Sequence, residues 1–260
     1  MKKLIRGIVD FRKNVRPSCK DTFARLALGQ QTDTLFIACS DGRVVPNVFA
    51  SSNPGDLFVI RNVGNLIPIC GEEGHSASDE SEAAAIEFSL LNLSVTDIIV
   101  CGHSECGAMI SISSGKAPAG ATNLKSWLRH GKTSLKKLEA GSTLGAHLER
   151  HNQLSQLNVL EQIEHLKTYP IVAERLEKGT LRLHAWWFDI KEADVYEYEP
   201  EDGGFRLIDE EYAEILLERV EQRTSASTAS ASSEKAQDDD SRPHRTFNDS
   251  PSGFHQDYRV

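Results

Sequence analysis

Four stretches of the chain are predominantly apolar, without a regular alternation of polar residues. They are TLFIAC (34–39), LFVI (57–60), DIIVCG (97–102) and TLRLHAWWF (180–188). Such runs are typical of strands in a sheet that is covered on both faces, because side chains on either face are then buried. We therefore expect them to form the strands of a buried, mostly parallel sheet.

Helical periodicity occupies the segments between and after these strands. The expected helices are 80–93, 157–179 with a break at Pro170, and 209–220. Acidic residues open the first of them, where they favour the helix dipole, and Gly179 follows the second, where glycine commonly ends a helix. Strands that alternate with helices predict an α/β fold, in which helices flank a mostly parallel central sheet.

The amino-terminal segment carries an apolar stripe of its own. Leu4, Ile8, Phe11 and Val15 recur at helical spacing, and basic residues and Asp10 interrupt them. This pattern differs from the unbroken apolar core of a secretory signal. We therefore expect an amino-terminal helical arm and a cytoplasmic protein.

Composition divides the chain into a domain and a tail. Periodic apolar residues end near Val220, and the Ser/Ala/Asp-rich remainder cannot bury enough surface to offset its ordering entropy. We expect residues 1–220 to form one folded domain and residues 221–260 to be disordered. The net charge of −9 argues against nucleic acid and anionic membranes as main partners.

Candidate metal ligands stand at the ends of two expected strands. Cys39 closes the first strand, and His103 and Cys106 follow the third in the sequence CGHSEC. Ligands of open α/β sheets bind beyond the carboxyl ends of the strands, so these three side chains should meet at one edge. Two thiolates and one imidazole suit zinc, and three protein ligands leave a position open for water, as in catalytic zinc sites.

Asp41, two residues after Cys39, is a candidate fourth ligand. Arg43 can hold that carboxylate in a two-pronged ion pair, which keeps it ionised and away from the metal. Asp41 would then accept a hydrogen bond from metal-bound hydroxide and orient it. Taken singly, each cysteine is better explained as a small buried apolar residue, and the Asp41–Arg43 pair as a turn salt bridge.

Taken together, four motifs resemble those of the β-class carbonic anhydrases. They are CSDGR, GDLFVIRNVGNLIP, CGHSECGAM and LHAWWFDI. The resemblance runs from the amino-terminal helix to about residue 210. It implies that one zinc ion per chain binds Cys39, His103 and Cys106, and that Asp41 becomes a ligand only in a closed form.

The resemblance also implies an activity and an assembly. The activity is the reversible hydration of carbon dioxide to bicarbonate and a proton by metal-bound hydroxide, with Asp41 and Arg43 as the catalytic pair. The arm would pack on a neighbouring subunit in a homodimer or a higher even homo-oligomer. The catalytic domain would then be residues 1–220.

Five further residues match the substrate pocket of the plant-like, constitutively open members of that family: Gln30, Phe58, Val63, Phe88 and Gly107. Phe36 stands where the bicarbonate-regulated members carry a tryptophan, which favours the open type. Two positions depart from the family pattern. Gly42 replaces a serine, and Phe88 lacks the hydroxyl of the tyrosine that is common there.

Two other functions fit the same residues. One is hydrolysis of carbon disulfide or carbonyl sulfide, which the resemblance also permits. The other is a non-catalytic zinc scaffold, against which the intact Asp41–Arg43 pair argues. Cys101 lies inside a strand and is expected to be buried packing. Five histidines lie among polar residues and are expected to be exposed, with none singled out as a proton shuttle: His75, His130, His147, His151 and His165.

Overall fold

The structure, a computed structural model, describes residues 1–30, 32–50, 52–71, 74–78 and 80–223. The chain divides into two compact units, 1–208 and 209–260. In the described part of the first unit, six strands form one sheet in the order β2-β1-β3-β4-β5-β6. Their bounds are β1 (Thr34–Cys39), β2 (Leu57–Asn62), β3 (Asp97–His103), β4 (Arg182–Asp189), β5 (Asp194–Glu199) and β6 (Gly204–Leu207).

The four expected strands are confirmed, and they pair in parallel. Strands β5 and β6 add an antiparallel edge beyond β4. Their sequences, DVYEYE and GFRL, mix polar and apolar residues, because the side chains of this edge are only half-buried. The pattern of continuous apolar runs therefore did not reveal them.

Helices join and follow the strands, and the expected helices are present with shifted boundaries. The two helices expected on either side of a break at Pro170 are confirmed, although the first begins earlier, at Arg150. Pro170 begins the second helix, where its missing N–H costs nothing. The helix expected at 209–220 spans residues 210–223, and residues 224–260 of the expected tail lie outside the described residues. The α-helices of the first unit are α1 (Lys2–Asp10), α2 (Arg16–Leu26), α3 (Pro46–Phe49), α4 (Ser81–Leu91), α5 (Gly107–Ser114), α6 (Thr122–Trp127), α7 (Lys132–Glu139), α8 (Arg150–Lys167) and α9 (Pro170–Glu177).

Successive side chains of the central strands point to opposite faces of the sheet, and other elements cover both faces. In β1, Leu35 and Ile37 pack with apolar residues of α4, α8 and α9. Phe36 and Ala38 belong to a second cluster, with Phe49 of α3 and aromatic residues of β4. Burial on both faces explains why β1 is apolar throughout.

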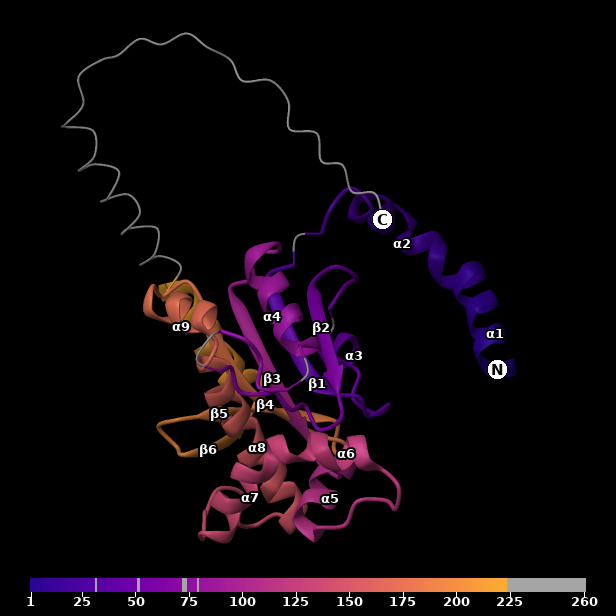
Figure 1. Ribbon diagram of the computed structural model, residues 1–260. Helices are drawn as coiled ribbons and strands as arrows, with labels where there is room; N and C mark the ends of the chain where they lie inside the picture. Colours follow the sequence, from indigo (N-terminus) through magenta and orange to yellow (C-terminus); the bar gives the residue numbers. More distant parts are fainter. Residues whose placement is uncertain (31, 51, 72–73, 79, 224–260) are drawn as a thin grey trace, which may run out of the picture. The chain divides into compact units, whose positions relative to one another are not determined.

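A third cluster lies where α5, α6 and α7 gather beyond one end of the sheet (Figure 1). Helix α8 joins this cluster to the sheet because it packs closely on β3. Gly102 permits that approach, since a Cβ atom there would lie 2.6 Å from Val159 Cγ2. Cys39 and Cys106 both belong to this cluster, so the candidate ligands are embedded in packed side chains.

The expected amino-terminal helix is confirmed. It runs from α1 through a π-helical turn at Phe11–Val15 into α2, and none of its described residues is buried. The stripe of Leu4, Ile8, Phe11 and Val15 is exposed. Elsewhere in the described part of the chain, as here, no helix has both the length and the apolarity that a membrane crossing requires.

Candidate metal centre and active site

The parallel pairing of β1 and β3 brings the candidate ligands to one edge. Cys39 ends β1, His103 ends the neighbouring strand β3, and Cys106 directly precedes α5. Their ligand atoms all lie within 4.8 Å of one another, and the exposed fractions of the three residues are 6%, 0% and 1%. The expectation that these side chains meet at one edge of the sheet is confirmed.

The hydrogen bonds of His103 leave one of its ring nitrogens available to a metal ion. Nδ1 of His103 lies 2.8 Å from the carbonyl oxygen of Ser104, which can only accept, so Nδ1 carries the proton. Nε2 then has a free lone pair, and it is buried with no hydrogen-bond partner among the described residues. A buried imidazole nitrogen of this kind is what a metal ion would satisfy.

The two sulfur atoms also fit a divalent cation. The Cys106 thiol donates a hydrogen bond to the sulfur of Cys39, which lowers the pKa of Cys39 and raises that of Cys106. The Gly64 N–H donates a further hydrogen bond to Cys39 Sγ over 3.3 Å. Two adjacent thiolates repel each other, and a cation between them would remove that repulsion. Together with the free imidazole nitrogen, this donor set fits zinc.

Asp41 and Arg43 form a two-pronged ion pair beside the cluster. Arg43 Nε donates to Asp41 Oδ1 over 2.9 Å, and Nη2 donates to Oδ2 over 2.7 Å. These hydrogen bonds hold the pKa of the Asp41 carboxyl well below its usual range. Asp41 is therefore ionised, and it is not a member of the ligand cluster found among the described residues.

Arg61 is a site residue that the sequence reasoning missed. Its Nε donates to the carbonyl oxygen of Cys39 over 3.0 Å, and its Nη2 donates to that of Asp41 over 2.5 Å. Arg61 thus fixes the backbone that carries both side chains. Its position was a usable signal, because Arg61 directly follows the expected strand LFVI and so lies at the sheet edge where the carboxyl ends of the parallel strands meet.

Comparison with known proteins agrees with this geometry. A family model described as carbonic anhydrase matches residues 34–195, which contain the whole cluster and the ion pair. The solved structure of the β-carbonic anhydrase CcaA is 37% identical, with 80% of this chain and 98% of that chain covered and a TM-score of 0.73. The chain belongs to the β-carbonic anhydrase family.

Other relatives cover a similar part of this carbonic anhydrase. The carbonic anhydrase of Pseudomonas aeruginosa is 36% identical over 195 residues, which are 75% of this chain and 86% of the relative. A structure from a study of two tetrameric β-carbonic anhydrases of Sordaria macrospora is 29% identical. The match covers 75% of this chain and 92% of that chain, with a TM-score of 0.59.

The five expected pocket residues of this carbonic anhydrase lie on different elements. The rings of Phe58 and Phe88 stack, with centroids 5.7 Å apart, and Phe88 is exposed. Val63 follows β2 and is exposed, and Gly107 begins α5 directly after Cys106. Gln30 is exposed and lies between α2 and β1. The structure brings Phe58 to Phe88. Phe58 lies four residues before Asn62, the last residue of β2, and Asn62 pairs with Cys39.

Two histidines of this carbonic anhydrase contradict the expectation of exposure. His130 and His165 are both buried. Nδ1 of His165 lies 2.6 Å from the carbonyl oxygen of Ile67, whereas His130 packs against the ring of Trp127, and burial lowers its pKa to about 4. For His165, polar neighbours misled the expectation because α8 buries a row of polar side chains that find partners inside the fold. His75 and His147 are exposed, and His151 is partly exposed.

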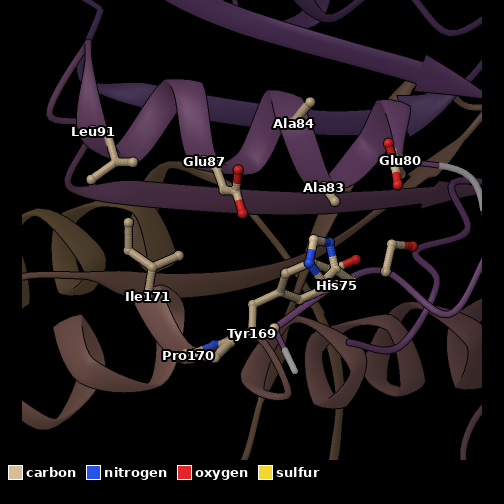
Figure 2. Close-up of a pocket in the computed structure, with 11 residues that line it drawn as sticks. His75, Glu80, Ala83, Ala84, Glu87, Leu91, Tyr169, Pro170 and Ile171 are labelled. Carbon is tan, nitrogen blue, oxygen red and sulfur yellow. The ribbon is translucent and has the colours of Figure 1, made fainter. Parts of the chain in front are cut away.

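Cys101 is buried, as expected, and burial raises its thiol pKa. A surface pocket of about 590 Å³ lies elsewhere, between α4 and the start of α9 (Figure 2). Glu87, Tyr169 and Ile171 are among its lining residues, which include no member of the metal cluster in the described part of the chain. Ligand geometry, and not this pocket, therefore locates the candidate site.

Proposed function

We propose that the chain catalyses the reversible hydration of carbon dioxide to bicarbonate and a proton, with one zinc ion held by Cys39, His103 and Cys106. The observation that carries the proposal is the convergence of these three buried donors beside an ion-paired aspartate. When bound, zinc supplies a Lewis acid that makes water nucleophilic at accessible pH. The two cysteine thiolates neutralise the metal charge, so we expect activity to rise towards alkaline pH.

Asp41 and Arg43 are the catalytic pair in this proposal. Arg43 keeps the carboxylate ionised and directed away from the ligand atoms. The remaining lone pairs of Asp41 accept a hydrogen bond from the attacking water, which turns the oxygen lone pair towards carbon. Because Asp41 stands outside the ligand cluster, this arrangement supports the plant-like, constitutively open type.

The substrate pocket is proposed from the family resemblance. Gln30 donates a hydrogen bond to a substrate oxygen, and Phe58, Val63 and Phe88 offer an apolar surface to a molecule without net charge. Gly107 leaves space beside the ligands, since a Cβ atom there would meet nothing within 4 Å.

We also propose a homodimer or a higher even homo-oligomer. The arm exposes its apolar stripe, and the edge strand β2 lies beside exposed Val63 and Phe88. A second copy of the chain would cover both features, and the Sordaria macrospora relatives are tetrameric. All five cysteines are free thiols, which suits a reducing compartment such as the cytoplasm.

Stopped-flow measurement of carbon dioxide hydration across pH, with zinc content determined on the same sample, tests the function. The wild-type protein should hold one zinc per chain and turn over faster at higher pH. Cys106→Ser should lose most of the metal, whereas Cys101→Ser should retain it. An inert, zinc-loaded wild type would refute the proposal, and faster turnover of carbonyl sulfide would favour the hydrolase alternative.

A further inference from the structure

The first turn of α8 contacts the short turn that carries two of the candidate ligands. Asn152 Oδ1 accepts a hydrogen bond from the backbone N–H of Glu105 over 2.7 Å. Asn152 Nδ2 donates to Glu105 Oε1 over 3.0 Å, and His151 Nε2 lies 3.1 Å from the same oxygen. Glu105 lies between the candidate ligands His103 and Cys106, so the hydrogen bonds from α8 reach the middle of this turn.

Glu105 adopts a backbone conformation that a side chain disfavours. Its φ angle is +56°, in the left-handed region that glycine occupies most easily. In that conformation its carbonyl oxygen accepts a hydrogen bond from Arg43 Nη2 over 3.0 Å. The same nitrogen donates to Asp41 Oδ2, so the Glu105 carbonyl is a second anchor for the catalytic arginine.

We infer that Asn152 is a positioning residue for the Asp41–Arg43 pair, acting through Glu105. Asn152 holds Glu105 in the left-handed conformation, the Glu105 carbonyl holds Arg43, and Arg43 holds Asp41. The inference rests on the proposed hydration of carbon dioxide, and it assigns to α8 a part in that reaction beyond packing.

Because it is buried, Asn152 is the most firmly held residue in this series of hydrogen bonds. Asn152 is 8% exposed, whereas the Arg43 side chain is 50% exposed and would otherwise be free to sample other conformations. Both polar groups of the amide are used, one on the backbone and one on the side chain of Glu105. A further hydrogen bond from α8, from Ser155 Oγ to the carbonyl oxygen of His103 over 2.8 Å, fixes the other side of the same turn.

Gln153 provides a matched control. It lies in the same helical turn, and its Nε2 donates to the carbonyl oxygen of Ser142, outside the metal-binding turn, over 2.9 Å. Asn152→Ala and Gln153→Ala each remove one amide from this turn. A loss that reflects only a weakened helix would therefore appear in both variants.

The experiment measures kcat and KM for carbon dioxide, zinc per chain, and hydrogen exchange of the Arg43 Nε–H group by nitrogen-15 NMR. In Asn152→Ala we expect retained zinc, a fall of about tenfold in kcat with KM nearly unchanged, and faster Nε–H exchange. Gln153→Ala should match the wild type in all of these. Equal kcat values in the wild type and Asn152→Ala, or equal losses in the two variants, would overturn the inference.

Rescue provides a second test. Glycine tolerates a φ of +56° without a clamp, so adding Glu105→Gly to Asn152→Ala should restore part of the lost kcat. No gain in the double variant would contradict the inference. If Asn152→Ala fails to fold, Asn152→Asp replaces it, because aspartate keeps the shape but sets a second carboxylate against Glu105. It should lower kcat in the same way, and normal kcat in that variant would count against the inference.

Failure of the proposed function can be recognised separately. A zinc-loaded wild type that does not hydrate carbon dioxide would refute the function, whereas the Arg43 Nε–H exchange still tests whether Asn152 positions the arginine. An active wild type with unchanged exchange in Asn152→Ala would refute the inference alone.

Discussion

In the proposed mechanism, Asp41 has to remain ionised beside the metal site without binding the metal. Arg43 meets this requirement by occupying both carboxylate oxygens. The arrangement depends on a short local connection, because the two residues are separated only by Gly42. The pair also receives support from distant parts of the chain, through Arg61 and the Glu105 carbonyl.

Replacement of Arg43 by alanine should release Asp41 to become a fourth metal ligand. We expect Arg43→Ala to retain zinc, because its three ligands are intact, and to lose about 100-fold in turnover. The cobalt-substituted variant should bind thiocyanate much more weakly than the wild type, as visible absorption would show. Arg129→Ala is the control, since Arg129 bonds only within its own helical segment among the contacts described. Normal turnover and normal thiocyanate binding would reduce the pair to a surface salt bridge.

His184 is a second residue whose charge the fold controls, at the end of the sheet opposite the metal cluster. Its Nε2 and Nδ1 each lie 2.9 Å from a carboxylate oxygen, of Asp97 and Glu197 respectively. Burial alone would lower the pKa of His184, but these two hydrogen bonds outweigh it and raise the pKa to about 9. Arg182, which pairs with Asp97, is the other charged neighbour.

Stability should therefore fall as this histidine loses its proton. Because its pKa is higher in the folded state, the contribution of His184 is complete below pH 6.5 and is lost as pH rises through about 9. The loss should be about 3 kcal/mol in the free energy of unfolding. Urea titrations at pH 6 and pH 10, at one protein concentration, measure how much the free energy of unfolding differs between the two pH values. This pH dependence should be smaller in His184→Gln than in the wild type. It should persist in His147→Gln, and an identical dependence in all three proteins would disprove the effect.

At the scale of elements, two surfaces of the fold are left uncovered by the residues that the structure describes. The amino-terminal helix exposes one apolar stripe, and β2 forms an open edge of the sheet. Apolar side chains contribute about 1.5–3 kcal/mol each when an interface buries them. Both features are thus consistent with the proposed association between copies of the chain.

Charges placed on the stripe should dissociate that assembly. We expect Leu4→Glu combined with Ile8→Glu to convert the protein to monomers, with the sheet domain still folded. Light scattering after size-exclusion chromatography measures the mass, and circular dichroism measures the fold. Arg6→Glu alters the polar side of the same helix and should leave the mass unchanged. An unchanged oligomer in the double variant would show that the stripe is not the interface.

At the scale of the whole molecule, the folded catalytic part should not need the region after Arg223. We expect a chain that ends at Arg223 to bind zinc and to hydrate carbon dioxide at the wild-type rate, since the remainder lacks a core-forming pattern. Thermal unfolding and stopped-flow assays of the truncated and full-length chains would compare them. A truncated chain that precipitates or loses its activity would show that the tail is structural.

Local pattern was enough to place the parallel strands and the candidate ligands. Unbroken apolar runs predicted β1 to β4, of which β1 and β3 are buried on both faces, whereas β2 and β4 are mostly half-buried. A parallel sheet necessarily brings the carboxyl ends of these strands to one edge. The positions of Cys39 and His103 at those ends followed from the sequence alone. The motifs around them were sufficient to suggest the family before any geometry was known.

Contacts between distant segments were decided only by the tertiary structure. Arg61, Asn152 and Ser155 support the site from β2 and α8, and no local spacing joins them to Cys39 or Glu105. Likewise, His130 and His165 sit among polar neighbours in sequence but are buried. His165 belongs to α8, which buries several polar side chains, and His130 packs against the ring of Trp127. Periodicity records which residues share a face of one element. Which element that face meets depends on packing, and packing set the partners of these side chains.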